Sequence, residues 1–292
     1  MPVLAVPAAE LYYQVTGSGP LVLLVAGAPA DATQFAAIAP VLARRHTVVT
    51  YDPRGYTRSK LANGPVEQHV GTHGDDAHRL LAALTAEPAH VIGIGGGALT
   101  GIELAIRHPR QVRTLLAYEP PVMDVLDDAA SWRRCYDDIV ATYHREGPFA
   151  AATALRELTG LDPGAKCEVN TDAAARRSRR NLRFFFEYQF THFAHIPDMD
   201  ALRATGVPVV WATGSASSGL PCHRATVELA RWHREPVVGF PGDHNAITTH
   251  PEDFAAAWCA AMSRTGSPHR LKRETRNSTM RNSATTRDGA AR

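Results

Sequence analysis

The sequence contains little lysine and no long hydrophobic run. Only three of its 31 basic residues are lysines, and 29 acidic residues nearly balance the bases to a net charge of +2 over 292 residues. Because the charge is balanced, we interpret the arginine excess as coding bias and expect no nucleic-acid partner. The longest strongly apolar run, residues 21–29, is far shorter than the about 18 residues of a membrane-spanning helix, so we expect no membrane partner.

Cysteine is scarce and scattered. No C-x-x-C pair and no zinc-ligand spacing occurs among the four cysteines, which are Cys135, Cys167, Cys222 and Cys259. We therefore expect free thiols, no metal site and no cofactor. The N-terminus has no basic segment before its short, proline-interrupted apolar stretch, so it does not indicate a secretory signal. These features predict a cytoplasmic protein.

Short apolar runs alternate with segments of helical period along most of the chain. This alternation predicts an α/β fold, with a mostly parallel central sheet flanked by helices. The predicted strands are residues 10–16, 21–27, 46–52, 90–94, 112–118, 207–214 and 236–240. The predicted helices are residues 32–43, 67–85, 98–108, 223–232 and 251–262.

Two stretches depart from this rhythm. Residues 121–205 contain only amphipathic helical segments, which predicts an all-helical cap inserted into a single domain of residues 1–262. The predicted cap helices are residues 131–146, 149–159 and 171–193. The last thirty residues, 263–292, have almost no large apolar side chains, and eight bases against two acids give them a net charge of +6. We expect this basic tail to be disordered, because it cannot bury enough surface to offset the entropy of ordering.

Three loops at the carboxyl ends of predicted strands share one sequence pattern. They contain Ala28-Pro29, the run Gly95-Gly96-Gly97-Ala98, and the run Gly242-Asp243-His244-Asn245. With TVVTYDPRGYTRS at residues 47–59 and THPEDFA at residues 249–255, this layout resembles the α/β-hydrolase superfamily, in particular its capped bacterial members. The resemblance covers about residues 10–121 and 206–262 and implies the capped α/β-hydrolase fold.

Against this family, two expected catalytic groups are missing. The resemblance implies a nucleophile elbow G-x-S-x-G, but Gly95 holds the serine position, and none of the eleven serines elsewhere lies in that frame. The loop at residues 215–218 contains no carboxylate where the family usually has its acid. Close backbone packing alone could also require the glycines. The resemblance further implies that the backbone N–H groups of Ala28 and Gly96 form an oxyanion site, which can bind a carbonyl oxygen without nucleophilic attack.

His244 matches the position of the family's catalytic base. Glu119, which follows the predicted strand at residues 112–118, is a position that some family members use for the acid. If the two side chains meet, His244 can act as a general base without a covalent intermediate, either by activating water or by taking a proton from a substrate hydroxyl. The reaction is then water-mediated hydrolysis or a proton-transfer step such as elimination, cyclisation or cofactor-free oxygenation. The alternative for Glu119 is an ion pair with a nearby arginine at the strand end.

A hydrophobic, small-molecule ligand is predicted from an aromatic segment in the cap. This segment contains Phe184, Phe185, Phe186, Tyr188, Phe190 and Phe193. Three successive phenylalanines must face more than one side of a helix, so part of the cluster is expected to roof the site. We predict that Asp31, Phe185 and Tyr188 line the substrate pocket.

Three functions remain open from the sequence. The first is an enzyme of hydrolase lineage that works without a serine nucleophile, and the second is a catalytically inactive relative that binds a small molecule or a partner. The third follows from the G-x-G-x-x-G/A match at residues 93–98, which fits a dinucleotide-binding turn, although a dinucleotide-binding domain normally starts with that unit. The sequence leaves the substrate and the oligomeric state open.

Overall fold

A nine-stranded sheet forms the centre of the molecule. The computed structural model describes residues 2–160, 172–190 and 195–265. Neighbouring strands follow the order β1-β2-β4-β3-β6-β7-β8-β9, with β5 paired to β2. The pairs that involve β2 are antiparallel and all others are parallel, so the predicted mostly parallel sheet is confirmed. The strands are β1 (Val3–Val6), β2 (Ala9–Thr16), β3 (Leu21–Val25), β4 (Thr47–Tyr51), β5 (Lys60–Leu61), β6 (Ala89–Ile94), β7 (Val112–Tyr118), β8 (Val209–Gly214) and β9 (Val237–Phe240).

The helices connect the strands and cover both faces of the sheet. They are α1 (Ala39–Leu42), α2 (Val70–Leu84), α3 (Gly96–Arg107), α4 (Ala129–Glu146), α5 (Pro148–Thr159), α6 (Asp172–Tyr188), α7 (Met199–Thr205), α8 (Pro221–His233), α9 (Ala246–Thr249) and α10 (Pro251–Thr265). The sequence does not predict β1, β5, α7 or α9 as separate elements. Each has seven residues or fewer, which is too short for a periodic pattern to be recognised.

The predicted continuous helix at residues 32–43 is wrong. A 3₁₀ turn, Ala32–Phe35, comes first, and α1 begins only at Ala39. The side chain of Asp31 caps the first turn by accepting the N–H of Thr33. Pro40 is the second residue of α1, a position in the first turn where its missing N–H is tolerated.

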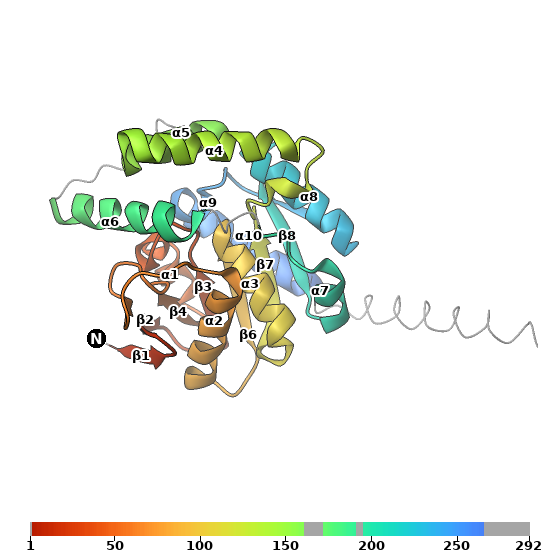
Figure 1. The fold of residues 1–292 in the computed structure, drawn as a ribbon. Helices are drawn as coiled ribbons and strands as arrows, with labels where there is room; N and C mark the ends of the chain where they lie inside the picture. The colour runs from red at the N-terminus through yellow and green to blue at the C-terminus, as the bar shows by residue number, and fades with distance from the viewer. Residues whose placement is uncertain (1, 161–171, 191–194, 266–292) are drawn as a thin grey trace, which may run out of the picture.

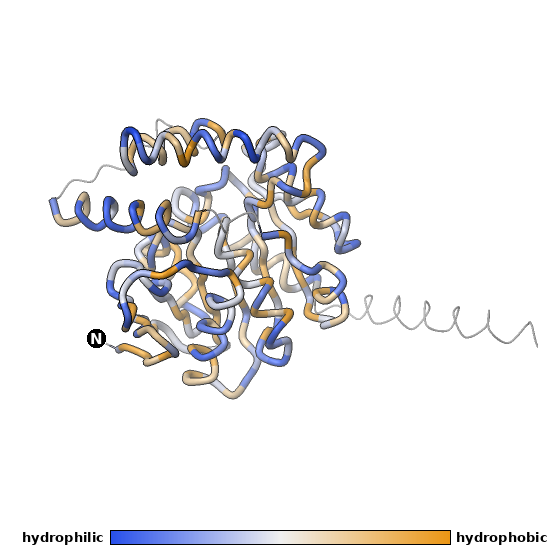
Figure 2. The backbone as a smooth tube through the Cα atoms, viewed as in Figure 1, coloured by the Kyte–Doolittle hydropathy of each residue, from blue (hydrophilic) through white to orange (hydrophobic). Residues whose placement is uncertain are grey.

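Alternate residues of each strand pack on opposite faces of the sheet, as the two-residue period of a strand requires. Leu23 and Val25 of β3 belong to one buried cluster, and Val22 and Leu24 belong to the other. Helices α2, α3, α7 and α8 cover the first face, and α1, α9 and α10 cover the second. In Figure 1, α2 and α3 lie in front of the strands, and Figure 2 shows hydrophobic residues concentrated in the strands between the helical layers.

Helices α4, α5 and α6 lie between β7 and β8 in sequence and form the cap. Figure 1 shows α4 and α5 across one end of the sheet, with α6 beneath them. Their apolar side chains make a third buried cluster with Tyr56, which follows β4, and Ala28, which follows β3, packs against it. The cap therefore covers the carboxyl ends of these strands. Helix α7 also falls in the predicted cap interval, but Met199 and Leu202 pack in the body of the molecule.

Some sequence predictions lie outside the described residues. These are Phe193, the ends of the predicted helix at residues 171–193, and the tail from residue 266 onward. Helix α10 continues to Thr265, three residues past its predicted end. Within the described ranges, no helix combines the length and the apolar character that a membrane span requires.

Candidate active site

The turn between β6 and α3 holds Gly95 in an unusual backbone conformation, with φ of 53° and ψ of −120°. Its N–H donates to the carbonyl oxygen of Tyr118 at 2.9 Å, which ties the turn to the end of β7. A positive φ of this kind favours glycine, although other residues adopt such sparsely populated conformations at a cost of about 1–3 kcal/mol. Gly95 thus stands at the sharp strand-to-helix turn at the carboxyl edge of the sheet.

Different structural constraints explain the glycines of this turn. A Cβ atom at Gly93 would lie 2.4 Å from the carbonyl oxygen of Gly97, and one at Gly97 would lie 2.1 Å from that of Val25. Close backbone packing therefore explains Gly93 and Gly97. A Cβ atom at Gly95 would have only the His244 ring within 4 Å, at 3.3 Å from Nε2 and 3.5 Å from Cε1. At Gly95 the space is bounded by a titratable side chain and not by backbone.

His244 and Glu119 are brought into direct contact. The distance from His244 Nδ1 to Glu119 Oε2 is 2.8 Å, and because a carboxylate only accepts, the ring donates its Nδ1–H. Glu119 Oε1 accepts the N–H of Gly214 at 2.9 Å, and the residue is 1% exposed. Glu119 also has a positive φ of 45°, which is backbone strain of the kind found at functional sites. The other ring nitrogen of His244, Nε2, lies 3.3 Å from where a Cβ atom of Gly95 would stand, and in the tautomer with its proton on Nδ1 it is an acceptor.

Glu119 supplies from β7 the carboxylate that the loop after β8 lacks. That loop contains the 3₁₀ turn Ser215–Ser217, and its residues 215–218 carry no acid. Since Glu119 binds the N–H of Gly214, its carboxylate reaches the end of β8 from the neighbouring strand. The expected ion pair of Glu119 with an arginine is not among the interactions of the described residues, where its partner is His244.

Several bonds fix the loop that carries His244. The hydroxyl of Tyr118 donates to the carbonyl oxygen of Asp243 at 2.6 Å, and burial beside Glu119 and Asp243 raises the pKa of that hydroxyl. The Asp243 carboxylate accepts the N–H of Asn245 at 2.8 Å. The N–H of Ala216 donates to the carbonyl oxygen of Gly242 at 2.8 Å. The histidine is therefore held on both sides by neighbouring strand ends.

Ala28 and Gly96 line one small cavity of about 10 Å³, which has space for about a single water molecule. The two loops that contain them touch, because a Cβ atom at Gly27 would lie 3.6 Å from the Gly96 nitrogen. Gly96 is the first residue of α3, so the helix offers no acceptor for its N–H. The arrangement can present backbone donors to one oxygen atom. The cavity is also lined by Val25, Ala26, Tyr51, Pro53, Tyr56, His73, Thr100 and Gln189.

The predicted pocket residues lie in the junction between cap and body. Asp31 is 3% exposed, and its carboxylate accepts hydrogen bonds from Thr33 Oγ1 at 2.5 Å, Thr57 Oγ1 at 2.6 Å and Asn181 Nδ2 at 3.2 Å. Burial opposes ionisation, but the bonds from Thr33 and Thr57 outweigh it and lower the pKa of Asp31. Arg177 adds a contact at 3.4 Å. Asp31 thus joins α6 to the body and does not line the small cavity.

The aromatic residues predicted for the pocket pack mainly on one another. The Phe185 ring lies 5.1 Å from that of Phe186, and the Tyr188 ring lies 5.3 Å from that of Phe184, between ring centres. Neither Phe185 nor Tyr188 lines the cavity, whereas Tyr56 and Gln189 do. Sequence reasoning also missed His73, whose only signal is a polar residue on the apolar stripe of α2. Groups of three or more possible metal ligands are absent from the described part of the chain.

Comparisons with known proteins bear on the family and the fold. A family profile described as the alpha/beta hydrolase fold matches residues 20–167. The uncharacterized hydrolase YraK of Bacillus subtilis (strain 168) is 35% identical over 259 residues, which cover 86% of this chain and 92% of that protein. A fluoroacetate dehalogenase of Burkholderia sp is 36% identical over 104 residues, 35% of this chain and 34% of its own.

Solved structures share the fold at low sequence identity. The crystal structure of the enol-lactonase from Burkholderia xenovorans LB400 superposes with a TM-score of 0.70 at 18% identity, over 90% of this chain and 100% of that one. Identity at this level bears on the fold alone. The predicted capped α/β-hydrolase architecture is thereby confirmed at the level of the fold.

Proposed function

The chain belongs to the α/β-hydrolase fold family, and on that premise we propose that it hydrolyses a small, hydrophobic ester without a serine nucleophile. One observation carries the proposal: the His244 Nε2 atom faces an open position at Gly95, 3.3 Å from where a Cβ atom would stand. A water molecule in this position replaces the missing serine oxygen. The hydrolase name of the Bacillus subtilis relative supports the reaction class and no particular substrate.

His244 acts as the general base in this reaction. Its Nε2 takes a proton from the water while the water oxygen bonds to the carbonyl carbon of the ester. The electron pair of the C=O bond moves to the carbonyl oxygen. The imidazolium then returns the proton to the leaving alcohol oxygen as the C–O bond breaks, which yields an acid and an alcohol. Glu119 holds the ring in the required tautomer through the 2.8 Å contact to Nδ1.

The oxyanion formed by attack is bound by the N–H groups of Ala28 and Gly96. Donors that are fixed in place before the reaction stabilise such charge without reorganisation, and loss of one typically costs about 10²- to 10³-fold in kcat. The hydrophobic part of the substrate is placed beside Tyr56, which lines the cavity with Ala28 and packs in the aromatic cluster of the cap.

A catalytically inactive binding protein is the second candidate. It is favoured by Gly95, which leaves the strand-to-helix turn between β6 and α3 without a side-chain nucleophile. In this alternative the same groups bind a ligand that is released unchanged.

Substitutions at Gly95 test the hydrolytic proposal. The purified protein, Gly95→Ala and Gly95→Ser are compared on activated esters and with a fluorophosphonate serine probe. We expect wild-type turnover without labelling, because water is the nucleophile. We expect Gly95→Ala to lose turnover, because its methyl group fills the water position 3.3 Å from His244 Nε2.

Gly95→Ser is the matched positive control, because it supplies the oxygen at the same position. It should react with the probe, and its labelling should vanish when His244→Ala is added. Labelling of the wild-type protein would contradict a serine-free site. Undiminished turnover in Gly95→Ala would contradict the placement of the water, and absence of any wild-type turnover across ester chain lengths would favour the binding alternative.

A further inference from the structure

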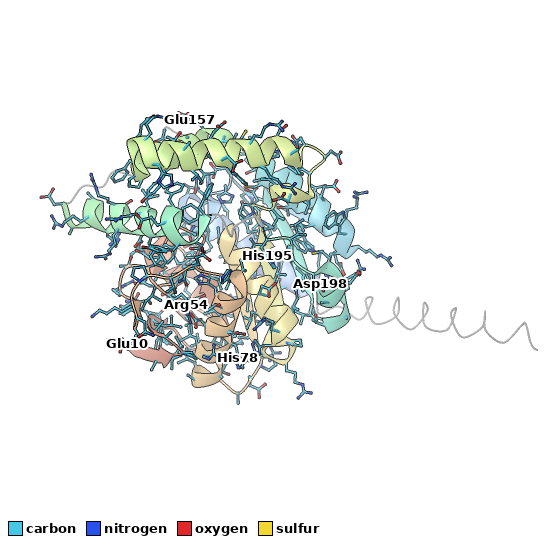
Figure 3. The ribbon with its side chains drawn as sticks, in the orientation of Figure 1. Glu10, Arg54, His78, Glu157, His195 and Asp198 are labelled. Atoms are coloured by element: carbon cyan, nitrogen blue, oxygen red, sulfur yellow. The ribbon has the colours of Figure 1, made fainter. Side chains whose placement is uncertain are left out.

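Helix α2 carries two polar side chains on its buried face. That face comprises His73, Gly74, Asp76, Ala77, Leu80 and Leu81. Asp76 is paired with Arg54 through bonds of 2.6 and 2.5 Å, and Figure 3 labels Arg54 beside this helix. His73 is only 4% exposed, and its Nε2 has no hydrogen-bond partner among the described residues. A buried polar atom without a partner is rare in native proteins and usually indicates a water, a ligand or a functional role.

The His73 side chain lines the same cavity as Ala28 and Gly96. Three of the residues that line this space of about 10 Å³ thus come from separate elements, and the space is enough for one oxygen atom with its hydrogens. Ala28 follows β3, Gly96 begins α3, and His73 projects from α2. An apolar residue would suit the buried stripe of α2 better, so the packing of the helix does not explain this histidine.

Resting on the proposed function, we propose that His73 is a third hydrogen-bond donor of the anion site. Its Nε2–H donates to the oxygen atom in this cavity. In the free protein that oxygen belongs to a water molecule. In the complex it is the carbonyl oxygen of the ester or one carboxylate oxygen of the acid product. The substrate class is accordingly an ester of a small monocarboxylic acid, whose apolar group faces the aromatic cluster that contacts Ala28.

The protonation of His73 suits this role. Burial, with Arg54 and His69 nearby, lowers the pKa of His73 to about 4, so the ring is neutral near pH 7. A neutral imidazole has one N–H donor and one acceptor nitrogen. Since the oxyanion only accepts, the bound state requires the tautomer with the proton on Nε2. A neutral donor also lets the product leave, because no buried ion pair has to be broken.

The test uses benzoate as the probe, since it is a small apolar carboxylate that needs no turnover. Its affinity is measured by calorimetry in wild type, His73→Leu and His73→Gln, alongside kcat and KM on the ester of best turnover. We expect His73→Leu to bind benzoate about tenfold more weakly and to lower kcat by about 30-fold with a smaller change in KM, because the bond strengthens as charge develops. His73→Gln keeps an N–H donor and should recover part of both losses.

His90→Leu is the matched control. Burial beside Arg113 and His46 also lowers the pKa of His90 to about 4, but this residue lies on β6 and does not line the cavity. It should leave kcat and benzoate affinity unchanged. If His73→Leu fails to fold, the ring ¹⁵N resonances of wild-type His73 decide: the assignment requires the Nε2–H tautomer and a shift of its proton signal on addition of benzoate.

The outcomes separate this assignment from the hydrolytic proposal. Benzoate binding that depends on His73, in a protein that turns over no ester, supports the third donor and rejects hydrolysis. Turnover that depends on His244, with kcat and benzoate affinity the same in His73→Leu and wild type, keeps hydrolysis and overturns the third donor. A wild-type protein that binds no benzoate contradicts the anion site and therefore the role of His73.

Discussion

The carboxyl edge of the sheet and the junction between cap and body each contain one buried carboxylate, and the two are used differently. Glu119 is 1% exposed and binds one backbone N–H and the ring of His244. Asp31 is 3% exposed and is surrounded by Thr33, Thr57 and Asn181, two from the body and one from the cap. Under the proposed function, the carboxylate saturated by fixed donors serves structure, whereas the one that contacts a histidine ring serves chemistry.

The largest expected effect separates these roles at Glu119. In Glu119→Gln the amide N–H₂ faces His244 Nδ1, so the ring must accept there and place its proton on Nε2. The base is then blocked, and we expect ester turnover to fall by about 10³- to 10⁴-fold, as it should in His244→Ala. The measurement is kcat at pH 7.5, with circular dichroism and melting curves as the control for folding. A variant with more than about a tenth of wild-type kcat would contradict the pairing of Glu119 and His244 as a catalytic unit.

The next effect concerns Asp31, where a substitution should change the stability of the protein and the motion of the cap more than the rate of ester turnover. Asp31→Asn removes charge-assisted bonds from a buried site, so we expect a loss of about 2 kcal/mol in unfolding free energy. Hydrogen exchange in α6 should accelerate, because Asn181 of that helix loses its acceptor. Most of the turnover should survive.

Arg177→Gln is the matched control for the cap junction. Its side chain is 39% exposed and lies 3.4 Å from Asp31, so we expect the unfolding free energy to fall by less than about 1 kcal/mol. Equal losses of unfolding free energy in Asp31→Asn and Arg177→Gln would show that the ion pair, and not the buried hydrogen bonds, holds the cap. A loss of turnover in Asp31→Asn as large as that in Glu119→Gln would remove the distinction between the two carboxylates.

The last predicted effect is on the pH dependence of stability and needs no substitution to be seen. His73 takes up a proton near pH 6.5 when unfolded and near pH 4 when folded, so the unfolded state binds more protons between these values. Stability should therefore fall as the pH falls through this window, by about 2 kcal/mol from this residue at pH 5. Asp31, whose pKa is lowered from 3.8, contributes stability that is lost only at lower pH.

Melting temperatures at pH 7.5 and pH 5 check this prediction. His73→Leu should show a smaller decrease than wild type, and part of the slope should remain because the pKa of His90 is also lowered to about 4. The same decrease in both proteins would contradict a buried neutral His73.

The sequence predicts the backbone-built parts of the molecule better than its side-chain junctions. The glycine-rich turn and the loop of His244 follow directly after apolar strands, and parallel strands bring their carboxyl ends together, so Gly95, Glu119 and His244 can be placed from the sequence. The role of Asp31 could not be predicted from the sequence, because its partner Asn181 lies 150 residues away on a helix whose position depends on packing. Phe185 looked like a pocket residue because adjacent phenylalanines cannot be assigned to faces before the neighbouring helices are known.

Local interruptions explain most of the remaining differences. Pro40, in the first turn of α1, separates that helix from the 3₁₀ turn Ala32–Phe35 and so divides the predicted helix at residues 32–43 in two. The edge strand β1 has only four residues, none of them fully buried, so its alternation is weak. His73 was missed because one histidine on an apolar stripe has no spacing signal, and only the cavity it shares with Gly96 distinguishes it.

Intact-protein mass spectrometry during turnover tests the central claim most directly. The protein is mixed with excess ester, quenched in acid during the steady state, and weighed beside Gly95→Ser treated in the same way. Direct attack on the ester by a water that His244 deprotonates predicts the unmodified mass for wild type while the ester is consumed, and an acyl adduct for Gly95→Ser. An acyl adduct on the wild-type protein, formed at a rate that accounts for turnover, would contradict hydrolysis without a covalent intermediate.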